Sequence, residues 1–177
     1  MEEIIDVLDE QTGEKTGETI LKSQAHRVGI WHGAIHLLIV SKDKTKTLLQ
    51  KRCEQKKLYP NTWDVAVGGH ISAGEDDLIS TKRELQEELG LNPDNYTIER
   101  LDRVKETLIN NGIISNEFVS LFIIYADIDI KDLKLQVEEV SEAKWVTKKE
   151  LNNLIKEKAI LPHVRDYEIL NNILIAE

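Results

Sequence analysis

The chain is short of cysteine and of long apolar runs, and each shortage excludes a class of protein. A single cysteine, Cys53, among 177 residues cannot form an internal disulfide, which fits a reducing compartment. Because Cys53 stands among charged residues, we expect a surface thiol rather than a nucleophile. No apolar run reaches the roughly 18 residues that span a membrane, and the acidic start Met1-Glu2-Glu3 is unlike a secretory signal. We therefore expect a cytoplasmic protein without a membrane partner.

Positive charge is also scarce, since 23 lysine and arginine residues face 32 acidic ones and leave a net charge of −9. This balance argues against a nucleic-acid polymer as partner. An anionic small molecule would need bound cations or a local basic cluster. The one dense basic cluster contains Lys51, Arg52, Lys56 and Lys57. It is either a solvated loop or a patch that contacts phosphate, and the sequence leaves both open.

The stretch from Gly69 to Leu91, GHISAGEDDLISTKRELQEELGL, carries the most specific pattern. Apolar spacing predicts a helix from about Asp76 to Leu89, and Gly90 suits its C-terminal cap. Positions i, i+3 and i+4 of that helix share a face that differs from the apolar one. Those positions are held by Glu84, Glu87 and Glu88.

The acidic face of this helix is electrostatically unfavourable without a ligand. Glu87 and Glu88 lie in the last turn, where the helix dipole disfavours anions by roughly 0.3 to 1 kcal/mol each. The like-charge pair of Glu84 and Glu88 adds about 0.2 to 0.5 kcal/mol. A divalent cation would remove both conflicts, because hard cations take carboxylate oxygens together with substrate phosphates. The alternative is an acidic face that is merely solvated.

The spacing around the helix favours the cation. Gly69, five residues, Glu75, seven residues and then the run from Arg83 to Leu91 match every fixed position of the Nudix box, so the sequence resembles the Nudix hydrolases. The resemblance implies an α/β (α+β) fold, an α/β/α sandwich with a central mixed sheet. It also implies that Mg²⁺, or Mn²⁺, is held by Glu84, Glu87, Glu88 and the Gly68 carbonyl. Arg83 could hold Glu75 by a bidentate pair.

Sequence patterning predicts the remaining elements of one domain covering residues 1–177. Residues 17–27 are expected to be irregular or a short helix. Thr147 and Glu150 form a capping box for a helix that runs to about Lys158. A last helix is predicted from Pro162 to Leu174. The predicted strands cover residues 4–8, 31–40, 47–52, 63–67, 96–104, 117–128 and 143–146.

Outside the box, the chain resembles the isopentenyl diphosphate isomerases and their Nudix relatives over most of residues 4–150. In the isomerases, histidines at the positions of His26, His32 and His70 bind a divalent metal together with two glutamates. One glutamate position is Glu117 here, whereas the other is Ser115, so the metal site is incomplete by that pattern. Ordinary loop or sheet-edge histidines are the alternative for His26 and His32. The matching stretches are Val7-Leu8-Asp9-Glu10 with Gly13 and Gly17, the three histidines, Leu49-Gln50-Lys51-Arg52, Tyr59-Pro60, Trp63, Gly69-His70 and Asn116-Glu117.

Two departures separate the chain from those isomerases. The position of their catalytic cysteine, immediately before the Gly-His pair, holds Gly68. The isomerases also typically lose the acidic residue at the place of Glu84, which this chain keeps. The residues for hydrolysis are therefore present and a residue for isomerisation is missing. An isomerase-like enzyme on isoprenoid diphosphates and a sensor without turnover stay as alternatives.

The predicted reaction is metal-dependent hydrolysis of a small-molecule diphosphate linked to a group X, by water attack on phosphorus. Arg83 and the three box glutamates form the predicted catalytic set. The resemblance makes Glu139 the first candidate for general base, ahead of Glu138 and Glu117, because many Nudix enzymes carry a functional glutamate in a comparable late loop. The identity of X and the oligomeric state, a homodimer included, stay open. The predicted substrate contacts are Lys51, Arg52, Lys57, Trp63 and His32.

Overall fold

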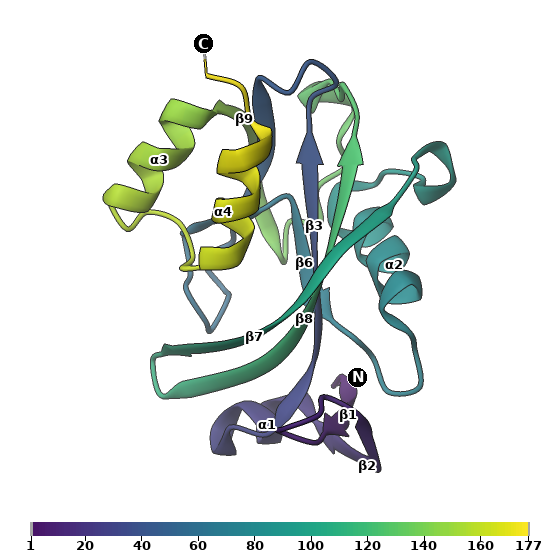
Figure 1. Ribbon diagram of the computed structural model, residues 1–177. Coiled ribbons are helices and arrows are strands. Elements are labelled where there is room, and N and C mark those ends of the chain that lie inside the picture. Colours follow the sequence, from purple (N-terminus) through teal and green to yellow (C-terminus); the bar gives the residue numbers. More distant parts are fainter. Residues whose placement is uncertain (1, 177) are drawn as a thin grey trace.

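The computed structural model describes residues 2–176 and shows a sheet between two helical layers. Figure 1 shows α2 on one side of the sheet and α3 and α4 on the other. The helices are α1 (Lys22–Val28), α2 (Asp77–Leu89), α3 (Lys148–Lys156) and α4 (Val164–Ile173). The strands are β1 (Ile4–Leu8), β2 (Lys15–Leu21), β3 (Trp31–Val40), β4 (Lys46–Arg52), β5 (Trp63–Val65), β6 (Val67–His70), β7 (Glu99–Asn110), β8 (Ile113–Tyr125) and β9 (Val140–Thr147). The predicted α/β/α arrangement is confirmed.

The sheet is mixed, as predicted, and β3 is its centre. β3 runs parallel to β8 from the Trp31–Asn116 pair to the Val40–Tyr125 pair, whereas it is antiparallel to β6. β3 meets β4 only at Val40, so the two strands diverge, with β6 paired to β3 and β5 paired to β4. β1 and β2 form a separate two-stranded sheet. The divergence places the glycine pair of β6 beside the inner strand β3.

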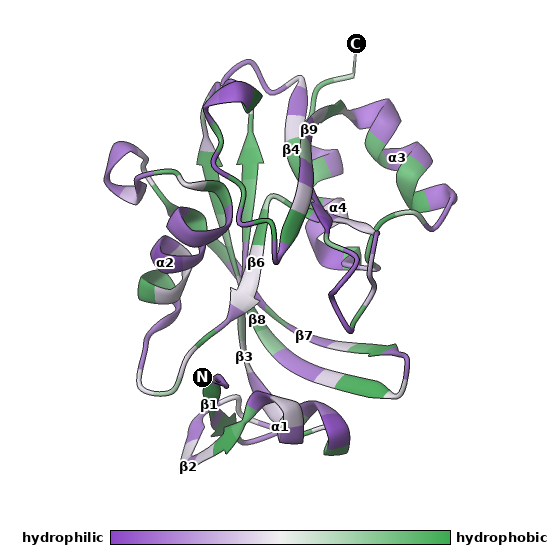
Figure 2. Ribbon diagram, turned by 180° about the vertical axis from the view of Figure 1, so that it is seen from behind, coloured by the Kyte–Doolittle hydropathy of each residue, from purple (hydrophilic) through white to green (hydrophobic). Residues whose placement is uncertain are grey.

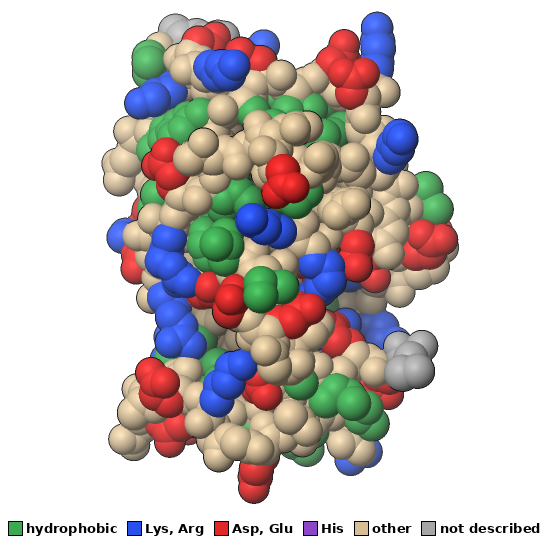
Figure 3. All heavy atoms as spheres, turned by 90° about the vertical axis from the view of Figure 1, so that its right-hand side faces the viewer, with side chains coloured by type: hydrophobic (Ala, Val, Ile, Leu, Met, Phe, Trp, Pro, Cys, Tyr) green, Lys and Arg blue, Asp and Glu red, His purple; other side chains and the backbone are tan. Residues whose placement is uncertain are grey.

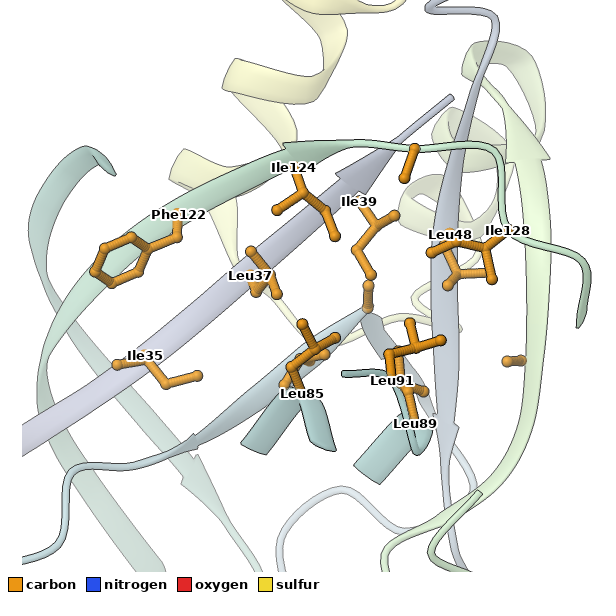
Figure 4. Close-up of a cluster of buried hydrophobic side chains, with 14 residues drawn as sticks. Ile35, Leu37, Ile39, Leu48, Leu85, Leu89, Leu91, Phe122, Ile124 and Ile128 are labelled. Atoms are coloured by element: carbon orange, nitrogen blue, oxygen red, sulfur yellow. The ribbon is translucent and has the colours of Figure 1, made fainter. Parts of the chain in front are cut away.

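Alternation along β3 divides its side chains between the two helical layers. Ile35, Leu37 and Ile39 pack with Leu85 and Leu89 of α2 (Figure 4). The intervening positions face α4, where Leu38 and Val40 pack with Leu170. Figure 2 shows hydrophobic and hydrophilic residues alternating along α2 and α3, as an amphipathic helix requires. His32 and His36 are the polar interruptions of the α4-facing row.

Local signals placed the ends of α2 correctly. The Asp76 side chain caps the helix by accepting from the Ile79 amide at 2.8 Å. Gly90 adopts the left-handed conformation at φ 69°, and a Cβ there would lie 2.6 Å from the Lys134 side chain. The predicted capping box of Thr147 and Glu150 is also confirmed, although α3 ends at Lys156 rather than Lys158.

Several predicted boundaries were wrong. Residues 17–27 hold most of strand β2 as well as α1. The predicted strand over residues 117–128 instead begins at Ile113 and ends at Tyr125, because the turn at Asn111 and Gly112 joins it directly to β7. α4 begins at Val164, two residues later than predicted. None of the helices within residues 2–176 has both the length and the apolar character needed to cross a membrane.

The expectation of a surface thiol at Cys53 was wrong. The residue is 2% exposed, and its amide donates to the Glu139 carbonyl at 2.9 Å. Its thiol donates to the Glu138 carbonyl at 2.8 Å. The loop before β9 therefore covers a cysteine whose immediate sequence neighbours are charged.

Candidate active site

A cavity of about 440 Å³ opens beside β6 and the last turns of α2. Glu84, Glu87 and Glu88 all line it, together with Gly68. Arg52 of β4 and Lys56 of the following loop line the same cavity. Figure 3 looks onto the side that carries α2 and shows acidic and basic side chains interspersed there. The structure thus gathers the predicted metal ligands and part of the basic cluster around one space.

Glu88 is the most enclosed of the three glutamates. It is only 4% exposed, and its Oε2 accepts from the Gln50 side chain at 3.0 Å and from the Gly68 amide at 3.3 Å. Burial and the nearby charge of Glu84 raise the pKa of Glu88 well above its usual range. Burial likewise raises the pKa of Glu84, against the opposing effect of Arg83. Two carboxylates that repel each other, one buried and one partly buried, are what a divalent cation would stabilise.

Arg83 holds the box together by several bonds. Its Nη1 donates to Glu84 at 2.7 Å and to Glu87 at 3.2 Å. Its Nε and Nη2 both donate to a single oxygen of Glu75, Oε2, at 3.3 and 3.2 Å. The predicted bidentate pair with Glu75 is therefore wrong in geometry, because the second carboxylate oxygen is not used. Nη2 also donates to the His70 carbonyl at 3.3 Å and so ties the helix to β6.

Gly69 leaves room for the Glu84 carboxylate, since a Cβ at Gly69 would lie 2.4 Å from Glu84 Cδ. We expect Gly69→Ala to displace that flexible carboxylate while leaving the fold intact. If the box glutamates hold Mg²⁺, as the Nudix resemblance implies, the Mg²⁺ concentration for half-maximal activity should rise about 10- to 100-fold, the range for a disturbed metal environment. Activity titrated with Mg²⁺, beside a thermal unfolding curve, measures both effects. An unchanged Mg²⁺ requirement would show that Glu84 can act from another position.

The predicted substrate contacts divide into two groups. Arg52 lines the cavity, where its guanidinium donates to the Leu58 carbonyl and to Asp64. Lys51 instead places its Nζ 5.8 Å from the centre of the Trp63 ring. Lys51, Lys57, Trp63 and His32 are not among the residues that line this cavity within the described part of the chain. Their roles as substrate contacts remain predictions.

Two of the three candidate general bases, Glu139 and Glu117, have side-chain partners. Glu139 lines the cavity and forms an ion pair with Lys56. Glu117 also lines it, but its Oε1 accepts from the Ser115 hydroxyl. The backbone carbonyl of Glu138 accepts from the Cys53 thiol. Lys56, which the sequence offered only as part of a basic run, thus lies nearer the site than its neighbours Lys51 and Lys57.

A second group of potential ligands joins the same cavity. Nitrogens of His26, His32 and His70 and an oxygen of Glu117 all lie within 4.8 Å of one another. His32 Nδ1 donates to the Ile30 carbonyl at 2.8 Å, which leaves its Nε2 buried and without a hydrogen-bond partner in residues 2–176. Burial lowers the pKa of His26 to about 3 and that of His32 to about 4.

Neutral imidazoles and an orphaned nitrogen fit a metal that prefers nitrogen ligands. We expect the wild-type chain to bind Co²⁺ with a visible ligand-field absorption that His32→Ala abolishes. Glu84→Gln, which leaves the histidines in place, should keep the absorption. A spectrum unchanged by His32→Ala would contradict metal binding at the histidines, whatever the activity of either variant.

A buried charge network on the α4 side of the cavity carried no sequence signal. His163 is 2% exposed, and its Nε2 lies 3.1 Å from Asp64 while its Nδ1 lies 2.8 Å from Glu106. These carboxylates outweigh burial and raise the pKa of His163 well above its usual range. Burial would raise the pKa of Asp64, but His163 and Arg52 hold it below its usual range. No short motif joins these residues, which lie far apart in the sequence.

The layered fold agrees with what comparison with known proteins shows. A family model described as "NUDIX domain" matches residues 31–166. The chain belongs to the Nudix family. "Nudix hydrolase 3" of Arabidopsis thaliana is 38% identical over 161 residues, which cover 89% of this chain but only 21% of the plant protein. An uncharacterized Nudix hydrolase of Listeria monocytogenes is 33% identical and covers 89% of this chain and 88% of its own length.

Further comparisons support the second resemblance and the fold. An isopentenyl-diphosphate Delta-isomerase of Dinoroseobacter shibae is 33% identical, covering 77% of this chain and 76% of the isomerase. A crystal structure from Deinococcus radiodurans superposes with a TM-score of 0.75 at 21% identity, over 97% of this chain and 99% of that one. Both predicted resemblances are confirmed. As a member of the Nudix hydrolases, the chain is a hydrolase that acts on diphosphate bonds, in a family that uses divalent metals.

Proposed function

We propose that this Nudix protein is a Mg²⁺-dependent hydrolase of an organic diphosphate, that is, a diphosphate linked to a group X. Water attacks phosphorus in this reaction. The observation that carries the proposal is the convergence of Glu84, Glu87 and Glu88 on a cavity that Arg52 and Lys56 also line. A strongly acidic chain needs such positive groups where an anionic substrate binds.

The donor set fits Mg²⁺ rather than a softer metal. Carboxylate oxygens and the Gly68 carbonyl are hard ligands, and among residues 2–176 the buried Glu88 carboxylate has no positive partner in direct contact. When bound, Mg²⁺ would neutralise the diphosphate and lower the pKa of a coordinated water. Glu84, Glu87, Glu88 and Gly68 would hold it.

The protein's own residues provide position and charge. Gln50 and the Gly68 amide fix the Glu88 carboxylate. Arg83 fixes Glu84 and Glu87, so the acidic face is set before substrate binds. Arg52 and Lys56 would attract the diphosphate oxygens.

Glu139 is our first candidate for the group that takes a proton from the attacking water. It lines the cavity, and its carboxylate forms an ion pair with Lys56. Substrate that draws Lys56 onto the diphosphate would leave Glu139 free to accept the proton.

The intact acidic position at Glu84 favours hydrolysis over isomerisation. Gly68 offers no side chain for proton transfer to carbon, and Glu84 lies in the cavity with the other box glutamates. The predictions of a single domain over residues 1–177, a cytoplasmic location and a possible homodimer are separate from this proposal and remain predictions.

Purified protein incubated with Mg²⁺ and a panel of organic diphosphates tests the proposal. Nucleotide sugars, dinucleotides, ADP-ribose, nucleoside triphosphates and isoprenoid diphosphates belong in the panel, with products separated by chromatography. We expect release of two phosphorylated products from at least one substrate, abolished by EDTA and restored by Mg²⁺. Metal-dependent binding without release would favour a sensor, and double-bond migration without release would favour an isomerase.

A further inference from the structure

The wall of the cavity beyond Gly68 carries a histidine that the hydrolytic reaction does not use. His36 of β3 lines the cavity and is only 5% exposed. Its Nδ1 lies 2.9 Å from Oδ1 of Asp166 in α4, which is itself 1% exposed. Asp166 therefore fixes the orientation of the ring, because a buried carboxylate and an imidazole N–H form a directional bond.

The other nitrogen of this ring is available. Within residues 2–176, His36 Nε2 makes no hydrogen bond, although the ring is more than nine-tenths buried. Asp166 does not line the cavity, so the edge of the ring that does so is the one opposite Asp166. Unlike Nε2 of His32, this nitrogen is not fully buried, so a group inside the cavity can reach it. His36 thus presents an unfilled hydrogen-bonding position to the cavity.

This position lies next to the box. A Cβ at Gly68 would be 3.6 Å from His36 Cδ2, the ring carbon bonded to Nε2. The amide of the same glycine donates to Glu88 at 3.3 Å. Gly68 therefore separates the innermost box carboxylate from the His36 ring. A diphosphate held at the box glutamates would extend its X group toward His36.

The surroundings of His36 are charged rather than apolar. The ring of His163 lies 4.2 Å away between centroids, and carboxylate oxygens of Glu106 and Glu117 lie within 4.8 Å of a His36 ring nitrogen. A hydrocarbon chain placed here would remove water from these groups without replacing their hydrogen bonds. A hydroxyl or amino group can donate to the carboxylates, and a hydroxyl can also accept from an imidazole N–H.

We propose that His36, held by Asp166, binds group X through Nε2, and that X is a polar group bearing hydroxyl or amino functions rather than a prenyl chain. The inference rests on the proposed function in one respect, namely that the diphosphate occupies the box glutamates. His36 is then the residue that determines specificity, and Asp166 is a positioning residue.

Substitutions at His36 can distinguish the roles of its two ring nitrogens. The Asn amide reaches the place of Nδ1 and keeps the bond to Asp166, whereas the longer Gln amide reaches the place of Nε2. Three probes share a methylene bridge that water cannot cleave: methylenediphosphonate without X, isopentenyl methylenediphosphonate and methylene-bridged ADP-ribose. Calorimetry in Mg²⁺ measures the Kd of each, whether or not the chain hydrolyses the natural compounds.

We expect wild type to bind methylene-bridged ADP-ribose more tightly than the isopentenyl probe. His36→Asn should raise the Kd of methylene-bridged ADP-ribose about tenfold, which corresponds to the loss of one hydrogen bond. The same substitution should leave the Kd of methylenediphosphonate unchanged. His36→Gln should restore the affinity for methylene-bridged ADP-ribose. An equal loss of affinity for all three probes in His36→Asn would indicate a structural role for His36 and overturn the proposal. Tighter binding of the isopentenyl probe than of the ADP-ribose probe by wild type would also overturn it.

A measurement on the wild-type chain avoids any problem of variant folding. In protein labelled with ¹⁵N at histidine, the His36 Nε2 resonance should shift when methylene-bridged ADP-ribose binds and stay in place with methylenediphosphonate. If the His36 Nε2 resonance did not shift when methylene-bridged ADP-ribose binds, the proposal would be contradicted. If binding discriminates as expected but no diphosphate is hydrolysed, the proposed function fails while the assignment of His36 holds.

Discussion

Glu88→Gln is expected to lower kcat/KM for every diphosphate that the chain hydrolyses by at least about 10²- to 10³-fold. That range is typical for losing one preorganised electrostatic group from an active site. The substitution keeps the size of the side chain, and Glu88 is 4% exposed between Gln50 and the Gly68 amide. Only the charge that would hold Mg²⁺ is removed. Steady-state kinetics over a range of Mg²⁺ concentrations measures the effect.

The matched control for this variant is Glu168→Gln. Glu168 lies in α4, its side chain is 57% exposed, and it does not line the cavity. We expect kcat/KM of the Glu168→Gln variant to equal that of wild type. The Glu88→Gln variant should unfold at or above the wild-type temperature, because an unpaired buried carboxylate is costly. Full activity in a folded Glu88→Gln variant would remove Glu88 from the metal site.

His163→Phe is expected to lower the free energy of unfolding by about 3 to 5 kcal/mol near pH 6, the usual cost of breaking a buried ion pair. The substitution leaves Asp64, 3% exposed, without the histidine that lies 3.1 Å away. It also removes the partner of Glu106 at 2.8 Å. Urea unfolding of both proteins measures the difference. Arg165→Gln, which breaks ion pairs of a solvent-exposed side chain, should leave the free energy of unfolding almost unchanged.

The contribution of this network should depend on pH in a defined direction. The pKa of His163 is raised in the folded protein, so its stabilisation is fully present below about pH 6.5 and is lost as pH rises through the raised value. The pKa of Asp64 is lowered, so its stabilisation is present above about pH 3.9 and is lost as pH falls through the lowered value. The difference in free energy of unfolding between wild type and His163→Phe should therefore be largest between these limits and should shrink at alkaline pH. A gap that is constant from pH 6 to pH 10 would contradict the charged histidine.

Local sequence signals sufficed for the box helix and its surroundings. Period, caps and fixed spacing placed α2 within one residue, because each depends on neighbours a few positions away. The capping box of Thr147 and Glu150 was predictable for the same reason. The likeness to Nudix proteins then gave the layers of the sandwich, which no local pattern specifies.

Residues whose partners are distant could not be predicted. His36 and Asp166 are 130 positions apart, and His163 and Glu106 are 57 apart. Cys53 was wrongly expected at the surface because the loop that buries it comes 85 residues later. Each of these contacts exists only once the sheet has brought separate strands together.

The basic cluster shows how strand geometry limits prediction from composition. Lys51 and Arg52 are neighbours on β4, and successive side chains of a strand point to opposite faces. Arg52 accordingly reaches Asp64 and the cavity, whereas Lys51 lies over Trp63. A run of basic residues thus does not bring all its side chains to the same cavity.

Hydrolysis in ¹⁸O-labelled water tests the central claim most directly. The reaction contains wild-type protein, Mg²⁺ and a diphosphate from the panel, and mass spectrometry of the separated products locates the label. We predict that one ¹⁸O atom appears on phosphorus in one of the two phosphorylated products, and that omission of Mg²⁺ prevents its incorporation. Label on carbon rather than phosphorus, or turnover that moves a double bond and incorporates no ¹⁸O, would contradict the account.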